Sequence, residues 1–363
     1  MREIQNRRKY FDVIKGIAII MVVVGHATND LFHCYAYTYH LALFFFISGV
    51  LYNEKKYGNN PALNIGNKIK NNWGKYLLYS SIIGILHFTG EFLGISNILG
   101  GKWNFAQYRN YSLNNILMNN TEAVCGAMWF VAPLIIASGI LGLIVYWGNK
   151  VEKCLHCNIA KHITIILLAI ACLLLGNERM VLKFQLQFRL DVALFVTPLL
   201  VIGYYIGTYL ENFYEYLKWY VMVPFFIFSL FFSLIGYQNS IVSQDVTFGG
   251  YYFLAIIGIY QSLYFAKLIC SYTKNISAFL SFIGKYTFEI MCFHFLVFKI
   301  IDFICYAIKG DSDVSILSTF PHTYNLGYVY VVFGCLIPAV VKFSVERIQI
   351  IIKKVISKSL FRE

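Results

Sequence analysis

The chain has 363 residues, of which 58% are hydrophobic and only 13% are charged. A soluble domain carries about 25% charged residues, so this composition excludes an ordinary soluble globular fold and indicates a protein embedded in a lipid bilayer. The formal net charge of +12 would suggest a nucleic-acid partner in a soluble protein. In a membrane protein, basic loop residues record topology instead, and we expect no nucleic-acid partner.

Hydrophobic stretches close to the ~20 residues that a membrane-spanning helix needs follow one another along almost the entire chain. They predict an all-α fold, a polytopic integral membrane helical bundle of about ten transmembrane helices, in a single domain over residues 1–363. The first apolar run follows a basic segment and so resembles a signal peptide, but Lys15 interrupts it and we expect a retained helix. The predicted helices centre on residues 10–27, 39–52, 73–90, 127–147, 162–176, 190–210, 217–236, 247–270, 284–306 and 326–350.

The distribution of basic residues predicts the orientation of the bundle. An even number of helices places both chain termini on the same side of the membrane. The loops and termini on that side hold most of the Lys and Arg residues, including Lys68 and Lys70. The positive-inside rule therefore predicts a multi-pass protein of the cell inner membrane with cytoplasmic N- and C-termini. The outer loop from 177 to 189 is basic as well, which would fit a loop that belongs to a cavity.

The first predicted helix contains three ionisable residues, Asp12, Lys15 and His26. At about 100° per residue, Lys15 and His26 point within roughly 20° of each other, and Asp12 lies within about 40° of the same direction. A charged side chain at this depth costs several kcal/mol unless it faces protein or water, so we expect this face to line a cavity. Histidine is the usual general base near neutral pH. A lone histidine at a helix end would more often be interfacial, but the alignment of Asp12 and Lys15 with His26 favours proton chemistry there.

The second predicted helix begins at His40, and the short hairpin before it should bring His40 towards His26. Ser48 and Gly49 follow on the same helix, where small residues permit close helix packing. The alternative is a nucleophilic Ser48 with a histidine partner, although Ser48 lies about two turns deeper than His40.

Nine cysteines are scattered mostly through apolar stretches, where we expect them to act as small hydrophobic residues. Cys154 and Cys157, with His156 between them and His162 after them, have zinc-like spacing. A single pair of this kind without a matched second pair is a weak signal, so we expect no metal site.

The segment from Tyr10 to Ile17 with Gly25 and His26, and the run from His40 to Gly49, resemble the acyltransferase 3 family of integral membrane acyltransferases. Within that family they are most similar to the fucose 4-O-acetylase-like branch. Further segments resemble weaker family signatures, namely Met128–Phe130, Leu190–Asp191 and Gly284–His294. The resemblance therefore covers most of the chain, although only the first fifty residues match specifically.

The chain also departs from the family pattern. Lys15 stands where many members have Arg, as is frequent in the fucose 4-O-acetylase-like branch, and a lysine lacks the planar fork that binds phosphate through two bonds. Ala42 stands where the branch tends to have Pro. The paired-Arg motif expected before the third helix is replaced at best by Lys68, Lys70 and Lys75.

The resemblance implies transfer of an acyl group, usually acetyl from cytosolic acetyl-CoA, onto a sugar hydroxyl of a surface polysaccharide or glycolipid. It implies that His26 is the essential histidine. Separately, we expect Asp12 to pair with Lys15 on the same helix. We expect Lys15, Lys68 and Lys70 to bind the anionic CoA, which is a donor substrate and not a tightly bound cofactor. A covalent acetyl-His26 intermediate is the alternative to direct transfer.

Residues of later helices are candidates for substrate binding together with His40. Trp129 would stack on a sugar ring or belong to an interfacial aromatic belt. His294 would join the cavity or bond a neighbouring helix, with Glu289 pointing about 140° away from it. Asp191 opens the sixth predicted helix next to Arg189, and we expect it to orient the histidine base or bind sugar hydroxyls.

A polytopic transporter or flippase of a glycan or small solute is the competing interpretation, because buried charge also marks transport pathways. Transporters are often built from repeated halves with matching broken helices. The later helices contain no second copy of the pattern from Asp12 to His26, which favours the enzyme.

Overall fold

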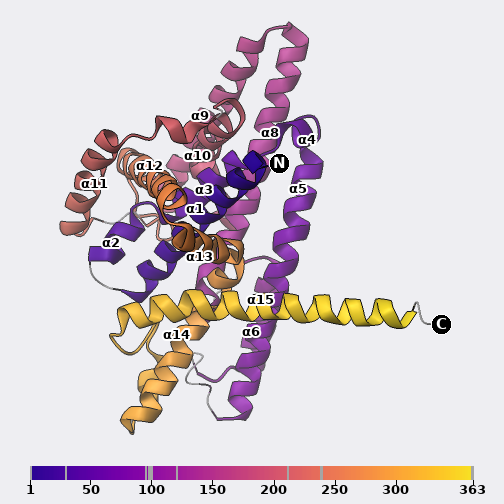
Figure 1. Cartoon of the computed structure of the whole chain (residues 1–363). Helices are drawn as coiled ribbons and strands as arrows, with labels where there is room; N and C mark the ends of the chain where they lie inside the picture. The colour runs from indigo at the N-terminus through magenta and orange to yellow at the C-terminus, as the bar shows by residue number, and fades with distance from the viewer. Residues whose placement is uncertain are drawn as a thin grey trace.

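The computed structural model describes residues 2–28, 31–94, 96, 101–119, 122–210, 212–237 and 240–360. The fold is 84% helical, and the described residues form no strand (Figure 1). The predicted all-α class is therefore confirmed. The longer helices are α1 (Arg2–Ala27), α6 (Gly74–Phe92), α8 (Val131–Leu155), α9 (Asn158–Val181), α10 (Leu190–Tyr209), α12 (Phe248–Tyr272), α14 (Thr287–Lys309) and α15 (Gly327–Leu360).

Shorter helices connect and brace the long ones. Several of them build the walls of the site, among them η1, which is a π-helix, and η3, a 3₁₀ helix that leads directly into α8. They are α2 (Leu31–Tyr37), α3 (His40–Val50), α4 (Glu54–Tyr57), α5 (Pro61–Lys68), η1 (Ile69–Trp73), α7 (Phe105–Ile116), η3 (Ala123–Phe130), η4 (Gln187–Arg189), η5 (Phe213–Tyr216), α11 (Trp219–Leu234), α13 (Lys274–Lys285) and η6 (Val314–Ser318).

Within the described residues, seven helices are long and apolar enough to cross a membrane, which supports a multi-pass membrane protein. The count of about ten predicted from the sequence is not confirmed. The predicted helices at 39–52, 73–90 and 217–236 exist as α3, α6 and α11, but none of them is among the seven. α3 and α11 are too short, and polar residues dilute the hydrophobicity of α6.

α1 runs through the middle of the bundle and packs most extensively against α13. Two glycines allow their backbones to touch: a Cβ at Gly284 would lie 1.8 Å from the carbonyl oxygen of Asp12, and one at Gly16 would lie 2.2 Å from that of Leu280. Small residues permit this close approach between membrane helices. The contact fixes the part of α1 that carries Asp12 and Lys15.

A second close crossing joins α3 to α10. A Cβ at Gly49 would lie 2.0 Å from the carbonyl oxygen of Leu200, and a Cβ at Gly203 would lie 2.2 Å from that of Phe46. The prediction that Gly49 permits close helix packing is therefore confirmed. This crossing fixes the height of α3, and with it the depth of His40 and Ser48 in the bundle.

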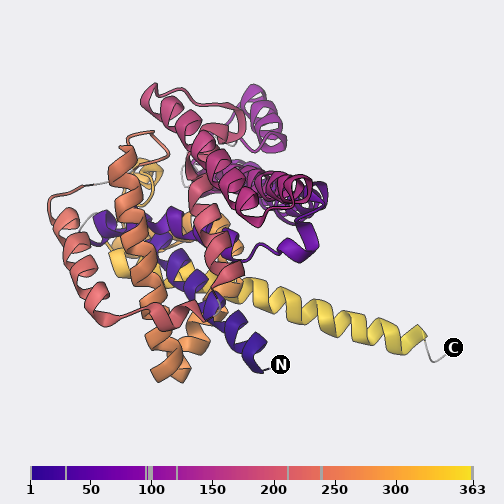
Figure 2. The ribbon, with the colours of Figure 1, turned by 90° about the horizontal axis from the view of Figure 1, so that it is seen from above.

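α15 is the longest helix, and its first turns pack against α1 and α14. Its C-terminal half extends away from the body of the molecule, as Figures 1 and 2 both show. The remaining helices gather around α1 and α3, which together carry the candidate site.

Candidate active site

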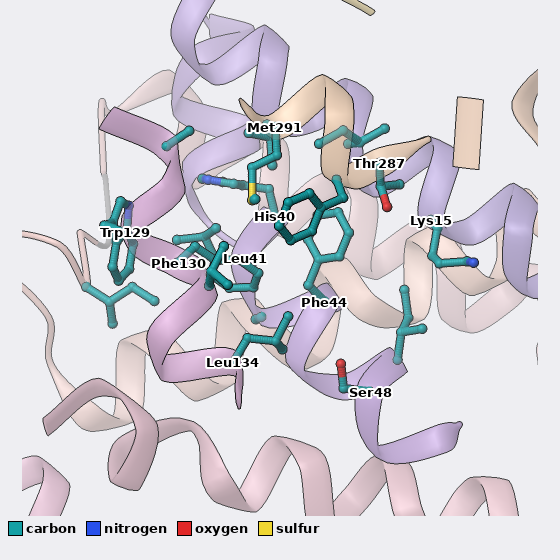
Figure 3. Close-up of a pocket in the computed structure, with 18 of the residues that line it drawn as sticks. Lys15, His40, Leu41, Phe44, Ser48, Trp129, Phe130, Leu134, Thr287 and Met291 are labelled. Carbon is teal, nitrogen blue, oxygen red and sulfur yellow. The ribbon is translucent and has the colours of Figure 1, made fainter. Parts of the chain in front are cut away.

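A cavity of about 300 Å³ lies between α1, α3, the end of η3 and the start of α14 (Figure 3). α1 contributes Lys15, Ile19, Val22 and His26 to its lining, at spacings of four, three and four residues. This spacing is that of a single helix face. The predicted cavity-lining face is thus found for Lys15 and His26, about 16 Å apart along the axis, but the prediction is wrong for Asp12, which lies outside the lining.

The end of the cavity near Lys15, here called the basic end, gathers three ammonium groups from three helices: Lys15, Lys75 of α6 and Lys285 of α13. Lys15 Nζ lies 2.6 Å from Asp12 Oδ1, which confirms the expected pair. Asp12 itself is not part of the lining. Glu289 lies at the same end, where it accepts a hydrogen bond from the Tyr79 hydroxyl at 2.8 Å and sits 3.7 Å from Lys75 Nζ.

The opposite end, here called the histidine end, centres on His26. Its ring stacks on that of His294, with centroids 5.4 Å apart and planes 24° from parallel. Phe295 packs edge-on at 4.8 Å, and the Tyr37 hydroxyl lies 3.5 Å from His26 Nδ1. Rings on several sides therefore hold the His26 imidazole in one orientation while it still reaches the cavity.

His294 supports His26 from behind and does not line the cavity. It is fully buried, and its Nδ1 lies 3.0 Å from the Ile290 carbonyl oxygen and 3.1 Å from that of Met291. Because a carbonyl only accepts, Nδ1 carries a proton and donates it there. The Nε2 atom is buried and has no hydrogen-bond partner within the part of the chain that the structure describes.

The hairpin after α1 brings His40 into the same cavity as His26, as the sequence predicts. His40 Nδ1 donates to the Ala36 carbonyl at 2.6 Å, which fixes the ring against its own chain. Tyr37 lies between the two histidines, 6.1 Å from the His26 ring and 5.2 Å from the His40 ring. His33 stacks on Tyr37 at 4.4 Å and donates to the Gly25 carbonyl.

Apolar side chains line the cavity between Lys15 and Trp129. Figure 3 shows Phe44, Leu41 and Met291 between Lys15 on one side and Trp129 on the other. Ser48 lies apart from His40 in this view, towards the other turn of α3. A ligand that spans the cavity would thus carry charge at one end and pass through an apolar stretch to the histidines.

Trp129 lines the cavity, and the Arg189 guanidinium lies over its ring at 5.2 Å. Asp191 is fully buried and outside the lining; it accepts hydrogen bonds from Arg189 at 3.2 Å and from the Gln244 side chain at 3.0 Å. Arg189 also donates to the Ile241 carbonyl at 2.8 Å. Asp191 and Arg189 therefore anchor a segment whose residues line the cavity, namely Ser240, Ile241 and Val242.

The same segment is held from its exposed side. Lys183 Nζ donates to Asp245 Oδ1 at 2.7 Å, and this hydrogen bond holds the pKa of the Asp245 carboxyl below its ordinary value. Asp245 and Ser240 also pair through their backbones. No residue from 177 to 189 lines either cavity, so the expectation that this loop belongs to a cavity is not met. Lys183 and Arg189 instead contact the segment whose residues line it.

The lysines expected to bind CoA lie in different places. Lys15 lines the first cavity, Lys68 lines a second one, and Lys70 is exposed and lines neither. From the sequence, Lys75 is predicted only as a substitute for a missing motif, and Lys285 and Tyr37 are not predicted as site residues. Lys285 lies within the Gly284–His294 segment, whose resemblance to a family signature was the available signal.

No group of three or more His, Cys, Asp or Glu residues in the described part of the chain is arranged to hold a metal ion.

Residues 8–340 match the acyltransferase domain of the acyltransferase 3 family, which is nearly the whole chain. No curated protein and no solved structure matches it. With its apolar helices and this domain, the chain belongs to the acyltransferase 3 family and is a membrane acyltransferase.

Proposed function

We propose that the protein is an O-acetyltransferase of the fucose 4-O-acetylase-like branch, which moves acetyl from acetyl-CoA to a sugar hydroxyl of a surface polysaccharide or glycolipid. The observation that carries this proposal is a single cavity that joins three lysines at one end to a histidine at the other. The positive-inside rule places the basic end towards the cytoplasm, where acetyl-CoA is found.

The basic end fits the anionic part of the donor. Lys15, Lys75 and Lys285 hold the CoA phosphates, and the ion pair with Asp12 at 2.6 Å orients the Lys15 side chain. The pantetheine arm is on the order of 15–20 Å long, which matches the ~16 Å from Lys15 to His26. The apolar stretch between them excludes water from the thioester, so hydrolysis does not compete with transfer.

At the histidine end, His26 acts as the general base. It takes the proton from the sugar hydroxyl as that oxygen bonds to the thioester carbonyl carbon. The carbon–sulfur bond then breaks, and the proton passes from His26 to the departing CoA thiolate. A positioned base of this kind supplies about 10²–10⁴-fold of the rate.

Other residues of this end position the base and the acceptor. His294 holds the His26 ring in place by stacking on it. His40 and Trp129 line the cavity and contact the acceptor sugar, for which an indole ring offers a stacking face. Asp191 acts on the acceptor through the segment from 240 to 242, which it anchors by way of Arg189.

The test supplies purified protein in detergent with radiolabelled acetyl-CoA and a panel of lipid-linked oligosaccharides. Wild-type protein should transfer label to at least one glycan, and His26→Ala should abolish the transfer. His162→Ala, which changes a histidine of α9 outside both cavities, should retain full activity. Full activity of His26→Ala would overturn the mechanism, and a wild-type protein without donor turnover would favour the transporter.

A further inference from the structure

A second cavity, also of about 300 Å³, adjoins the first one. The two share Ser48, Leu51 and Asn72 in their linings, and Asn72 lies three residues before Lys75 of the basic end. The volume lies at the lower end of the ~300–1,000 Å³ that small-molecule sites occupy. A ligand that reaches from His26 to the three lysines therefore meets a second chamber at its far end.

The lining of this chamber is dominated by neutral polar groups. Four of its residues carry carboxamides and two are tyrosines, while Lys68 supplies the only charge among the lining residues that the structure describes. The carboxamides belong to Asn64, Asn67, Asn71 and Asn72, and the tyrosines are Tyr52 and Tyr57.

The π-helix η1 presents Asn71 and Asn72 to this chamber. In a π turn the backbone amide bonds to the carbonyl five residues back, which widens the turn and shifts side chains relative to an α-helix. The Asn72 side chain donates to the Lys68 carbonyl at 3.0 Å and so stabilises the widened turn. Single π turns inside helices occur frequently at functional sites.

One of these polar groups lacks a hydrogen-bond partner among the described residues, and another makes only a long hydrogen bond. The Tyr52 hydroxyl is buried and has no hydrogen-bond partner among the residues described here. Asn67 reaches the Tyr57 hydroxyl only at 3.4 Å. Burial lowers the pKa of the Lys68 ammonium below its ordinary value. Buried polar groups are normally paired, so this chamber is suited to a ligand with several donors and acceptors and an anionic group.

We propose that the second cavity is the nucleotide subsite of the donor, which takes the adenine ring and the ribose 3′-phosphate of CoA. This inference rests on the proposed use of acetyl-CoA. Carboxamides such as those of Asn67 and Asn71 bind the N6 and N7 edge of adenine through two hydrogen bonds, and a tyrosine ring stacks on its face. Lys68 pairs with the 3′-phosphate as a point charge.

The position of the chamber favours the nucleotide over the acceptor sugar. It opens beside the lysines, whereas the transferred acetyl group has to lie at His26, about 16 Å along α1. A sugar bound in this chamber would be too far from the base to react. The end of the donor that lies beyond its diphosphate is therefore the fitting occupant.

The experiment compares three donors on the full-length protein: acetyl-CoA, 3′-dephospho-acetyl-CoA and S-acetylpantetheine. Lys68→Met should raise KM for acetyl-CoA about tenfold and leave KM for the dephospho donor unchanged, since a lost ion pair of about 1.4 kcal/mol corresponds to that factor. Asn71→Leu should raise KM for both nucleotide donors but not for S-acetylpantetheine. Lys55→Met and Asn110→Leu, which change exposed residues outside both cavities, should behave as wild type.

Titration calorimetry with CoA, dephospho-CoA and pantetheine gives a readout that does not depend on transfer. Lys68→Met should weaken binding of CoA but not of dephospho-CoA, and Asn71→Leu should weaken binding of both but not of pantetheine. Lys68→Arg should retain most of the affinity for CoA. Equal losses with all three compounds, or no loss with any, would overturn the nucleotide subsite even if acetyl transfer is intact. Failure of the proposed function would look different, because the wild type would then bind none of the three.

Discussion

The two ends of the cavity are built on opposite principles. The basic end consists of partly exposed ammonium groups from helices that are far apart in the sequence. The histidine end consists of packed rings, three of which are tied to backbone carbonyls by their own Nδ1 atoms. Charge attracts a ligand without demanding one geometry, whereas proton transfer requires atoms within hydrogen-bond reach. Variants of the basic end should therefore impair donor binding, and variants of the histidine end should impair the chemical step.

The largest effect is expected for a variant of the histidine end. His26→Asn should lower kcat by about 10²–10⁴-fold, the contribution of a general base, while KM for acetyl-CoA stays within about twofold of the wild type. Initial rates over a range of acetyl-CoA concentrations measure both constants. A variant that raised KM and kept kcat would assign His26 to binding and remove the contrast between the ends.

A second prediction concerns the crossing that supports the basic end. Gly284→Ala places a methyl group where the Asp12 carbonyl oxygen lies, and overpacking of this kind costs typically 1–3 kcal/mol. We expect a lower unfolding temperature in detergent, measured by light scattering and fluorescence. Gly249→Ala is the matched control, because a Cβ at Gly249 meets nothing within 4 Å. Equal melting of the two variants would mean that α1 and α13 separate easily.

The third prediction sharpens the contrast from the basic end. Lys75→Gln and Lys285→Gln should each raise KM for acetyl-CoA several-fold, up to about tenfold, with little change in kcat. The salt dependence of KM should also become weaker, because exposed charges are screened. Lys274→Gln removes a lysine of α13 that does not line the cavity and should leave KM unchanged. A fall in kcat with constant KM would contradict this assignment.

The smallest effect is expected for Arg189, whose guanidinium lies over the ring of Trp129 in the cavity lining. Arg189→Lys loses the planar contact with Trp129, worth about 0.5–1 kcal/mol, and should raise KM for the acceptor about threefold without affecting the donor. Asp245→Asn removes an exposed ion pair from the same segment and should change neither constant. If both variants behaved alike, the anchoring role of Arg189 would be wrong.

The sequence predicts the histidine end better than the basic end. The helical spacing of Lys15 and His26 is enough to place both on one wall, and the hairpin length is enough to bring His40 near. The convergence of Lys75 and Lys285 depends instead on how α6 and α13 pack around α1, which no local pattern encodes. The stacking of His294 on His26 could not be predicted from the sequence either. Helix geometry gives only the direction of the His294 side chain relative to that of Glu289 on the same helix.

The second cavity illustrates a different limit. The four asparagines are visible in the sequence, but residues 64 to 72 fall in a loop between the predicted helices 39–52 and 73–90, whereas the structure has α5 and η1 there. The π turn from Ile69 to Trp73 arises in the folded chain, and it alters the direction of the side chains that follow it. The helix count failed for a similar reason, since α3 carries the hydrophobicity of a membrane helix without its length.

The glycine contacts along α1 and α3 limit the motions that are open to this bundle. With Gly284 against the Asp12 carbonyl and Gly49 against that of Leu200, neither helix can turn about its own axis without driving one backbone into another. A rocking cycle that opens a chamber first to one side of the bilayer and then to the other would have to break both fits. On the proposed function, acetyl transfer at His26 should therefore proceed without such a rocking motion of α1 and α3.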